Sequence, residues 1–178
     1  MPDAASGPLA WGAKVSLAFR QKVREIAAGL LCDPNDLMAC MAWESGRSFR
    51  ADVKNMAGSG AVGLIQFMPS TAESLGTSTA ALEAMTPEEQ LGWVEKYFAP
   101  YRGRLHSLSD LYMAILWPRA VGQPDSTVIF DVNDHDHPAR YRQNAGLDIN
   151  HDGHCTKAEA AGRVVAIKAE GMRPLNVR

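Results

Sequence analysis

The sequence predicts a mainly α fold. Apolar residues recur at helical spacing in several segments, and several of those segments begin with a residue that can cap a helix. The chain has 178 residues, of which 46% are apolar and 21% are charged, an ordinary balance for a globular domain. A chain of this length can bury about 70% of its unfolded surface, so we expect a single domain over residues 1–178.

The first helix is expected at about residues 19–30, after a loose lead at 1–12 that Pro and Gly interrupt. Its apolar face consists of Phe19, Val23, Ile26 and Leu30. A second helix should begin at Asp33-Pro34, because Asp33 can cap it and Pro34 fits the first helical position. That helix should run to about Glu44.

The remaining elements show clear start signals and one long irregular stretch. Thr86-Pro87-Glu88-Glu89 combines a capping box with Pro at the first helical position. Residues 52–64 are rich in Gly, Ala, Ser and Asn and have no clean period. The expected elements are a loop at 52–64, a short helix after Pro69, helices at 86–101, 109–116 and 157–170, and a β-like run at 126–130.

Composition excludes several classes of protein. The formal net charge is -2, so no global basic field would attract nucleic acid. No stretch approaches the roughly 20 apolar residues of a membrane span, and the first residues lack the basic and apolar regions of a signal peptide. Cys32, Cys40 and Cys155 are too few and too irregular for a disulfide framework. We expect reduced thiols, no stable membrane insertion and no nucleic-acid partner.

Glu44 is the first candidate catalytic residue. It shares one helix face with Leu37, Cys40 and Met41, so its carboxyl group continues an apolar face. Loss of hydration and the negative end of the helix dipole both favour the protonated form, as a general acid requires. The alternative is a frayed helix end whose carboxylate turns out to solvent.

Two motifs occur in order around this residue. Glu44 is followed by Ser45, and residues 60–69 read GAVGLIQFMP. The pair resembles the soluble lytic transglycosylase family of the lysozyme superfamily, which carries a Glu-Ser pair and then Gly-x-x-Gly-Leu-Met-Gln followed by Pro and a short helix. Ile65 replaces the Met of that motif. The resemblance covers about residues 20–122 and implies a lysozyme-like (SLT-type) helical domain with its core at 13–122.

The resemblance implies cleavage of the β-1,4 bond between N-acetylmuramic acid (MurNAc) and N-acetylglucosamine (GlcNAc) in peptidoglycan. Glu44 would protonate the glycosidic oxygen and then, as a carboxylate, accept the proton of the sugar 6-hydroxyl, giving a 1,6-anhydro end. If water attacks instead, the same site is a hydrolytic lysozyme. Most glycosidases use two carboxylates, but nothing around Asp52, the nearest downstream acid, marks it as a partner.

Five further residues are candidates for substrate binding: Ser45, Asn55, Gly63, Gln66 and Tyr112. The Gln66 amide can donate and accept, which suits an N-acetyl group, and Gly63 lets backbone approach the glycan or the catalytic helix closely. The alternatives are a helix cap for Ser45 and a loop-bracing amide for Gln66. The family carries an Ala-Tyr-Asn-like triplet on a later helix, but no Asn follows Tyr112, so an ordinary core residue is the alternative there.

A second motif lies near the C-terminus. Residues 148–159 read DINHDGHCTKAE, which matches the EF-hand pattern D-x-[DN]-x-[DN]-G-x5-E. The predicted Ca²⁺ ligands are Asp148, Asn150, Asp152, His154 through its carbonyl, Thr156 and Glu159. We expect one structural Ca²⁺ site in a C-terminal loop-and-helix extension at 139–171, with no metal required for chemistry. Cys155 stands where a branched apolar residue is usual, the preceding stretch is short for a helix, and a metal-free turn is the alternative.

The leading hypothesis for the whole chain is a phage endolysin. Its small size, the missing leader and the missing wall-binding repeat fit a monomeric enzyme made in the host cytoplasm and released by a holin pore. Its partner would be the glycan strands of peptidoglycan in the periplasm or cell wall. An enzyme of a secretion apparatus or a virion tail is the nearest rival, and a non-catalytic, calcium-stabilised glycan-binding or assembly protein is the alternative of a different class.

Overall fold

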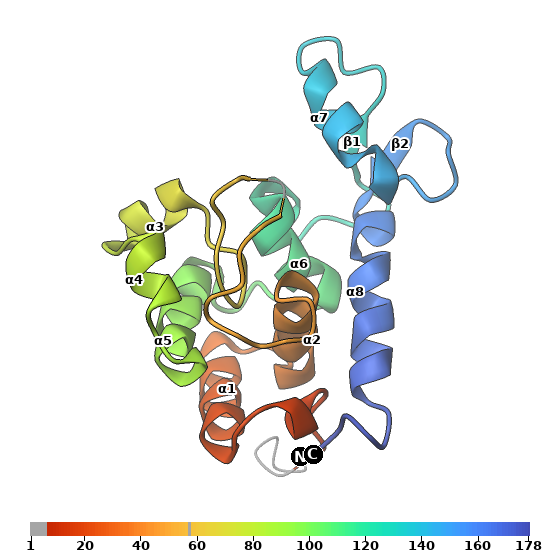
Figure 1. Ribbon diagram of the computed structural model, residues 1–178. Coiled ribbons are helices and arrows are strands. Elements are labelled where there is room, and N and C mark those ends of the chain that lie inside the picture. Colours follow the sequence, from red (N-terminus) through yellow and green to blue (C-terminus); the bar gives the residue numbers. More distant parts are fainter. Residues whose placement is uncertain (1–6, 57) are drawn as a thin grey trace.

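The computed structural model describes residues 7–56 and 58–178 and shows a helical body with a small lobe at one end (Figure 1). The mainly α prediction is confirmed. The α-helices are α1 (Leu17–Leu30), α2 (Pro34–Glu44), α3 (Pro69–Leu75), α4 (Thr79–Glu83), α5 (Pro87–Phe98), α6 (Leu108–Leu116), α7 (Pro138–Asn144) and α8 (Lys157–Gly171). The 3-10 helices are η1 (Gly12–Lys14), η2 (Ala99–Tyr101), η3 (Pro118–Ala120) and η4 (Ala145–Leu147), and the strands are β1 (Val128–Asp131) and β2 (His154–Thr156).

Helix α2 is the central element of the body. Helices α1, α6 and α8 all pack against it, and residues 37–42 are each 0% exposed. A helix that is apolar on all sides is stable only when neighbours surround it. Glu44, the last residue of α2, is therefore carried by the most enclosed helix of the body.

The predicted helix starts are confirmed where capping residues mark them. Asp33 caps α2 as predicted, with its side chain accepting from the Asn35 N–H. Helix α1, by contrast, begins at Leu17, two residues earlier than expected, with Ser16 as a cap that was not predicted. Thr86 and Glu89 form the predicted capping box at the start of α5. These bonds satisfy backbone donors that a helix leaves unpaired in its first turn.

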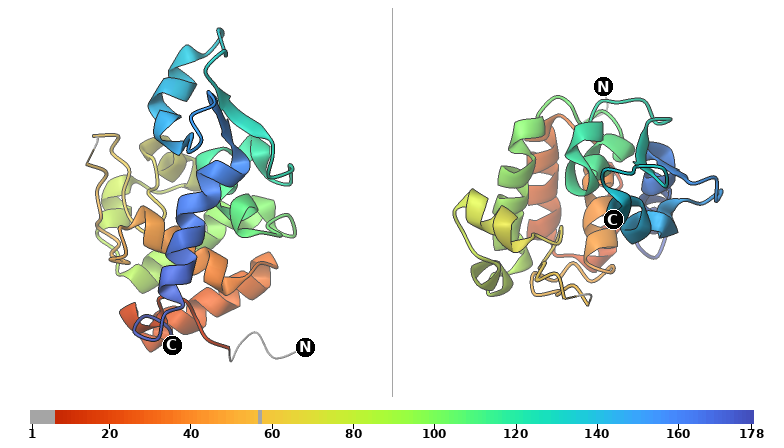
Figure 2. Two further views of the ribbon diagram at one scale, coloured as in Figure 1. Left: turned by 90° about the vertical axis from the view of Figure 1, so that its right-hand side faces the viewer. Right: turned by 90° about the horizontal axis from the view of Figure 1, so that it is seen from above.

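Helix α8 runs along one whole side of the body (Figure 2). It packs against α2 and α6. Its buried apolar residues are Ala160, Ala161, Val164 and Ile167. At its start the buried Lys157 ammonium lies 2.5 Å from Asp110 of α6 and donates to the Gln123 carbonyl at 2.8 Å. The C-terminal segment is thus part of the main core.

The small lobe stands above α8 and consists of β1, α7 and β2 (Figure 1). The strands pair antiparallel, with Phe130 opposite Cys155 and Asp131 opposite His154. The β-like run expected at 126–130 is confirmed as β1. The sequence analysis did not predict α7, although Pro138 occupies its first turn, a position that Pro favours.

The expectation of a loose lead was wrong for residues 9–12. Leu9 and Trp11 are 0% and 2% exposed. The Leu9 N–H donates to the Arg178 carbonyl at 2.6 Å, and the Trp11 N–H donates to the Gly171 carbonyl at 3.0 Å. These partners are far away in sequence, so local patterns could not reveal them. Residues 1–6, the rest of that predicted lead, lie outside the described part of the chain.

Among the described residues, no helix is both long enough and apolar enough to cross a bilayer. The three thiols are unpaired, as expected.

Candidate active site

Glu44 lies against the protein interior at the end of α2. Burial raises the pKa of its carboxyl group from the usual 4.5 to about 7. The Glu44 charge also contributes to the raised pKa values of Tyr97 and Tyr112, after the larger effect of their burial. Glu44 is therefore half-buried near two phenol groups, one from α5 and one from α6, and is not the solvent-exposed helix end that the sequence left open.

The two tyrosines are fixed by hydrogen bonds to the protein. The Trp43 indole N–H donates to the Tyr112 hydroxyl at 3.2 Å, and the Tyr97 hydroxyl donates to the Ala114 carbonyl at 2.7 Å. Phe67 packs edge-on against Tyr97, with the ring centroids 6.1 Å apart. An aromatic wall of this kind excludes water and favours the protonated carboxyl group. No sequence pattern indicated Tyr97, because nothing local shows that its ring lies near the end of another helix.

The loop between α2 and α3 is folded back on itself. Val62 and Phe67 exchange backbone hydrogen bonds of 3.1 and 2.8 Å, and the Gly63 N–H donates to the Val53 carbonyl at 2.8 Å. These bonds fix residues 53–56 and 58–67 next to the aromatic wall at Phe67. The described residues of the loop predicted from its Gly-rich composition are thus held by backbone hydrogen bonds.

Gln90 of α5 supports this loop, a role that was not predicted from the sequence. Its side chain is 0% exposed. Its carbonyl oxygen accepts from the Leu64 N–H at 2.7 Å, and its amide donates to the Ala51 and Leu82 carbonyls at 3.0 and 2.9 Å. A signal was present: Gln90 precedes Val94 by one helical turn, so a polar side chain interrupts an apolar face.

The backbone of Gly63 lies close to the Gln90 side chain, and not to the catalytic helix as one expectation had it. Its φ is +87°, and a Cβ atom there would lie 2.3 Å from the Gln90 carbonyl oxygen. No side chain fits in that space. Its contact with substrate stays a prediction.

Gln66 and Ser45 both make hydrogen bonds within the protein. The Gln66 amide nitrogen donates to the Val53 and Gly63 carbonyls, each at 3.1 Å, which leaves its amide oxygen to accept from a ligand. Gln66 also lines a hollow together with Tyr97. The buried Ser45 hydroxyl accepts from the Phe49 N–H at 3.0 Å. The bonds favour the bracing and capping alternatives, and substrate binding stays a prediction for both residues.

Asn55 lies on the exposed outer part of the same loop. Its backbone N–H donates to the Ala61 carbonyl at 3.0 Å. It lines a hollow with Lys54 and Glu83, whose charged groups are 2.8 Å apart. A role for Asn55 in glycan binding stays a prediction.

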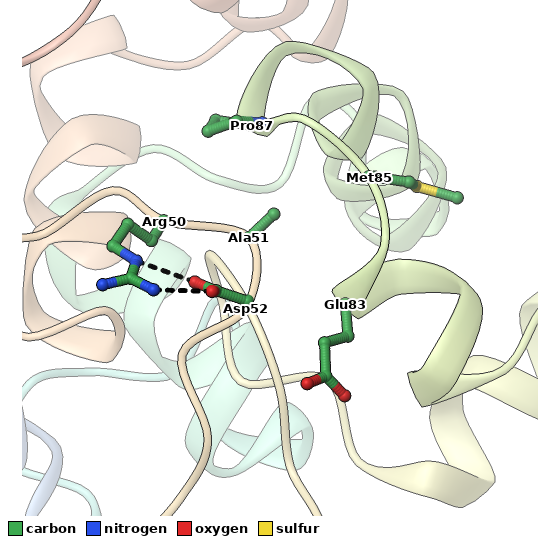
Figure 3. Close-up of a pocket in the computed structure, with 6 residues that line it drawn as sticks. All are labelled: Arg50, Ala51, Asp52, Glu83, Met85 and Pro87. Carbon is green, nitrogen blue, oxygen red and sulfur yellow. Dashed lines mark hydrogen bonds and ion pairs between the residues drawn. The ribbon is translucent and has the colours of Figure 1, made fainter.

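Asp52 is held by a neighbouring cation. Arg50 Nε and Nη2 donate to the two carboxylate oxygens of Asp52 at 2.8 and 2.6 Å (Figure 3). These bonds lower the pKa of Asp52, the opposite direction to Glu44. Asp52 lines a hollow with Glu83, Met85 and Pro87 (Figure 3). The second carboxylate of a glycosidase pair acts as a base or a nucleophile, and both oxygens of Asp52 are already engaged by Arg50.

Helix α8 also reaches the site. The Arg163 guanidinium lies 6.0 Å from the centre of the Trp43 ring, and its Nη2 donates to the Gly146 carbonyl at 2.8 Å. Arg163 thereby joins the residue before Glu44 to the small lobe. Its distance in sequence from Trp43 explains why no local pattern indicated this.

Comparison with known families identifies the part of the chain that carries the site. Residues 23–107 match the family described as the transglycosylase SLT domain. This segment is a transglycosylase SLT domain. Members of that family are lytic transglycosylases that act on peptidoglycan, which confirms the enzyme class and the substrate that the resemblance implied. Comparison with curated proteins found no match.

The SLT domain match has clear limits along the chain. It contains Glu44 and the 60–69 run, but it ends before α6, the small lobe and α8. Tyr112 and Arg163 therefore come to the site from outside the matched segment.

Proposed function

We propose that the SLT domain cleaves the MurNAc-GlcNAc β-1,4 bond with Glu44 as the single acid and base. The observation that carries the proposal is the burial of Glu44, which raises its pKa to about 7. At neutral pH a carboxyl group with this pKa is protonated in about half of the molecules, so Glu44 can serve both as the acid and, ionised, as the base. The pairing of Asp52, the nearest downstream acid in the sequence, with Arg50 supports a mechanism with a single carboxylate.

In the proposed reaction Glu44 donates one proton and later accepts another. Glu44 gives its proton to the glycosidic oxygen while the bond from that oxygen to C1 of MurNAc breaks. The acetamido oxygen of the same sugar stabilises the cation at C1. The sugar 6-hydroxyl then bonds to C1 and its proton passes to the Glu44 carboxylate, which restores the acid. In this proposal the Gln66 amide oxygen accepts from an acetamido N–H group of the substrate.

Mass spectrometry of digested peptidoglycan tests this proposal. The anhydro product and the reducing-end product differ by one water. We expect the anhydro product from the native protein and a loss of about 10²–10⁴-fold in Glu44→Gln, because proton transfer by a placed group contributes that much. Asp52→Asn is the matched control and should retain turnover.

Each other result selects a different alternative. A reducing-end product would identify a hydrolytic lysozyme with the same acid. Binding to peptidoglycan with neither product would indicate the non-catalytic glycan-binding protein. A folded Glu44→Gln variant with native turnover would overturn the assignment of Glu44.

The endolysin role stays a prediction from the sequence, together with release from the host cytoplasm to the periplasm or cell wall and the monomeric state. Expression in bacteria with and without a holin tests it. Lysis that requires the holin would support the role, whereas lysis at the same rate without it would contradict holin-dependent release.

A further inference from the structure

Residues 148–159 run from the end of η4 through β2 into the first turn of α8. Asp148 is 1% exposed, and one of its carboxylate oxygens accepts from the Gly153 N–H at 3.0 Å. The side-chain oxygens of Asn150 and Asp152 accept from backbone N–H groups two residues further on, at 2.9 and 2.8 Å. Gly153 has a φ of +86°, and a Cβ atom there would lie 2.8 Å from Val132. The chain thus curls around its own acidic residues.

The loop leaves buried polar atoms without partners. Three side-chain atoms in the described part of the chain are buried with no hydrogen-bond partner, and all three belong to this loop. They are Oδ1 of Asp148, Nδ1 of His154 and Oε1 of Glu159. A buried carboxylate oxygen without a donor is costly. Two such oxygens, at the first and last positions of the segment, are available as ligands for a cation.

The geometry points to a binding site for one Ca²⁺ ion in the loop 148–159, which we propose as a structural metal site of this protein. Asp148, Asp152 and Glu159 would supply carboxylate oxygens, Asn150 its amide oxygen, and His154 its backbone carbonyl. Thr156 would complete the shell directly or through water. Oxygen ligands in this number suit Ca²⁺, whereas Zn²⁺ prefers a tetrahedral set rich in nitrogen and sulfur.

The second carboxylate oxygens of Asp148 and Glu159 are already held by hydrogen bonds within the protein. Tyr141 of α7 donates to Asp148 Oδ2 at 2.6 Å, so the short helix before the loop positions the first ligand. Glu159 Oε2 accepts from the Thr156 N–H and hydroxyl at 2.9 and 2.7 Å, which leaves Oε1 directed to the loop. EF-hand loops usually pair with a second calcium loop. Here β2 pairs with β1 instead, so β1 takes the place of the second loop.

The site must still contract around the ion. Among the residues that the structure describes, no three His, Cys, Asp or Glu side chains already stand close enough together to hold a metal. Carboxylates repel one another without a cation, and Ca²⁺ would draw Asp148, Asp152 and Glu159 inward. The ion would thereby tie α7 and β2 to the start of α8.

Thermal unfolding of the full chain tests the site. With chelator, then with Ca²⁺ well above its Kd, the melting temperature should rise by several degrees, because a ligand that binds only the folded state stabilises it. Mg²⁺ at the same concentration should have a smaller effect, since it demands near-octahedral geometry. Calorimetric titration of chelated protein with Ca²⁺ should give one site per chain.

Variants separate metal binding from folding. Glu159→Gln keeps the capping contacts with Thr156 but weakens the ligand, and Asp152→Asn changes a ligand that is exposed. Both should lose most of the Ca²⁺-dependent shift. Glu170→Gln removes one charge from the same helix outside the loop and should keep the full shift. Native melting curves that superimpose with chelator and with Ca²⁺, or no heat of binding, would overturn the proposal. Neither readout depends on the enzymatic activity.

Discussion

The ionisation of Glu44 should control how lysis depends on pH. Its pKa is raised to about 7 by burial, and bond cleavage begins with its protonated form. We expect kcat/KM on purified peptidoglycan to fall about tenfold for each pH unit above about 7. Initial rates between pH 5 and pH 9 measure this. A rate that stays constant from pH 6 to pH 9 would contradict the role of Glu44 as the acid.

The same residue should make the protein less stable at alkaline pH. The folded pKa lies above the unfolded value of 4.5, so the folded state holds the proton more tightly. Stability is therefore fully present below about 4.5 and declines as pH rises to about 7. Glu44→Gln has no carboxylate to bury, so its advantage over the native protein should grow between pH 5 and pH 8, by at most about 3 kcal/mol.

Urea unfolding of both proteins at the two pH values measures this difference. An equal difference between Glu44→Gln and native protein at pH 5 and pH 8 would show that the Glu44 carboxylate is well solvated in the folded state.

At the scale of the element, the Gln90 side chain supports the loop between α2 and α3 at Ala51 and Leu64. Gln90→Leu should leave the Leu64 N–H and the Ala51 and Leu82 carbonyls buried without partners. Each such group costs about 1–3 kcal/mol, so we expect a large fall in melting temperature. Gln66→Ala removes two hydrogen bonds that the side-chain amide donates. Because this side chain is partly exposed, the substitution should cost less stability than Gln90→Leu, while weakening activity per folded molecule.

Circular dichroism melts and lysis assays on the two variants test this ranking. A Gln90→Leu protein with a native melting temperature would show that water or a loop rearrangement replaces its bonds. A Gln66→Ala protein that loses stability but keeps its activity per folded molecule would assign Gln66 wholly to loop bracing.

The sequence predicted those helices whose starts and faces depend on neighbouring residues alone. Asp33, Thr86 and the apolar spacing correctly placed the starts of α2, α5 and the body of α1. The helical face of Glu44 and the two motifs after it indicated the acid. Tyr97, Gln90 and Arg163 were missed because their roles depend on contacts between elements that are far apart in sequence.

At the scale of the whole molecule, α8 lies outside the segment that matches the SLT family but belongs to the same hydrophobic core. It covers α2 and α6, and the buried Lys157-Asp110 pair fixes its first turn. The Trp11 indole N–H donates to the Ile167 carbonyl at 3.0 Å near its other end. The helix carrying Glu44 is thus enclosed by α1, α6 and α8 together, and its rigidity should depend on the C-terminal segment.

Two neighbouring valines on α8 provide a matched test of this dependence. Val164 is 0% exposed and belongs to the core, whereas Val165 is 54% exposed. Val164→Asp would bury an unpaired carboxylate, which costs several kcal/mol, so it should unfold the protein or lower its melting temperature severely and abolish lysis. Val165→Asp makes the same chemical change one residue later and should alter stability by about 0.5 kcal/mol or less. Thermal melts and zymograms of both variants decide the matter. Native-like melting and lysis by Val164→Asp would mean that α8 is an appendage and that the first 122 residues hold Glu44 in place by themselves.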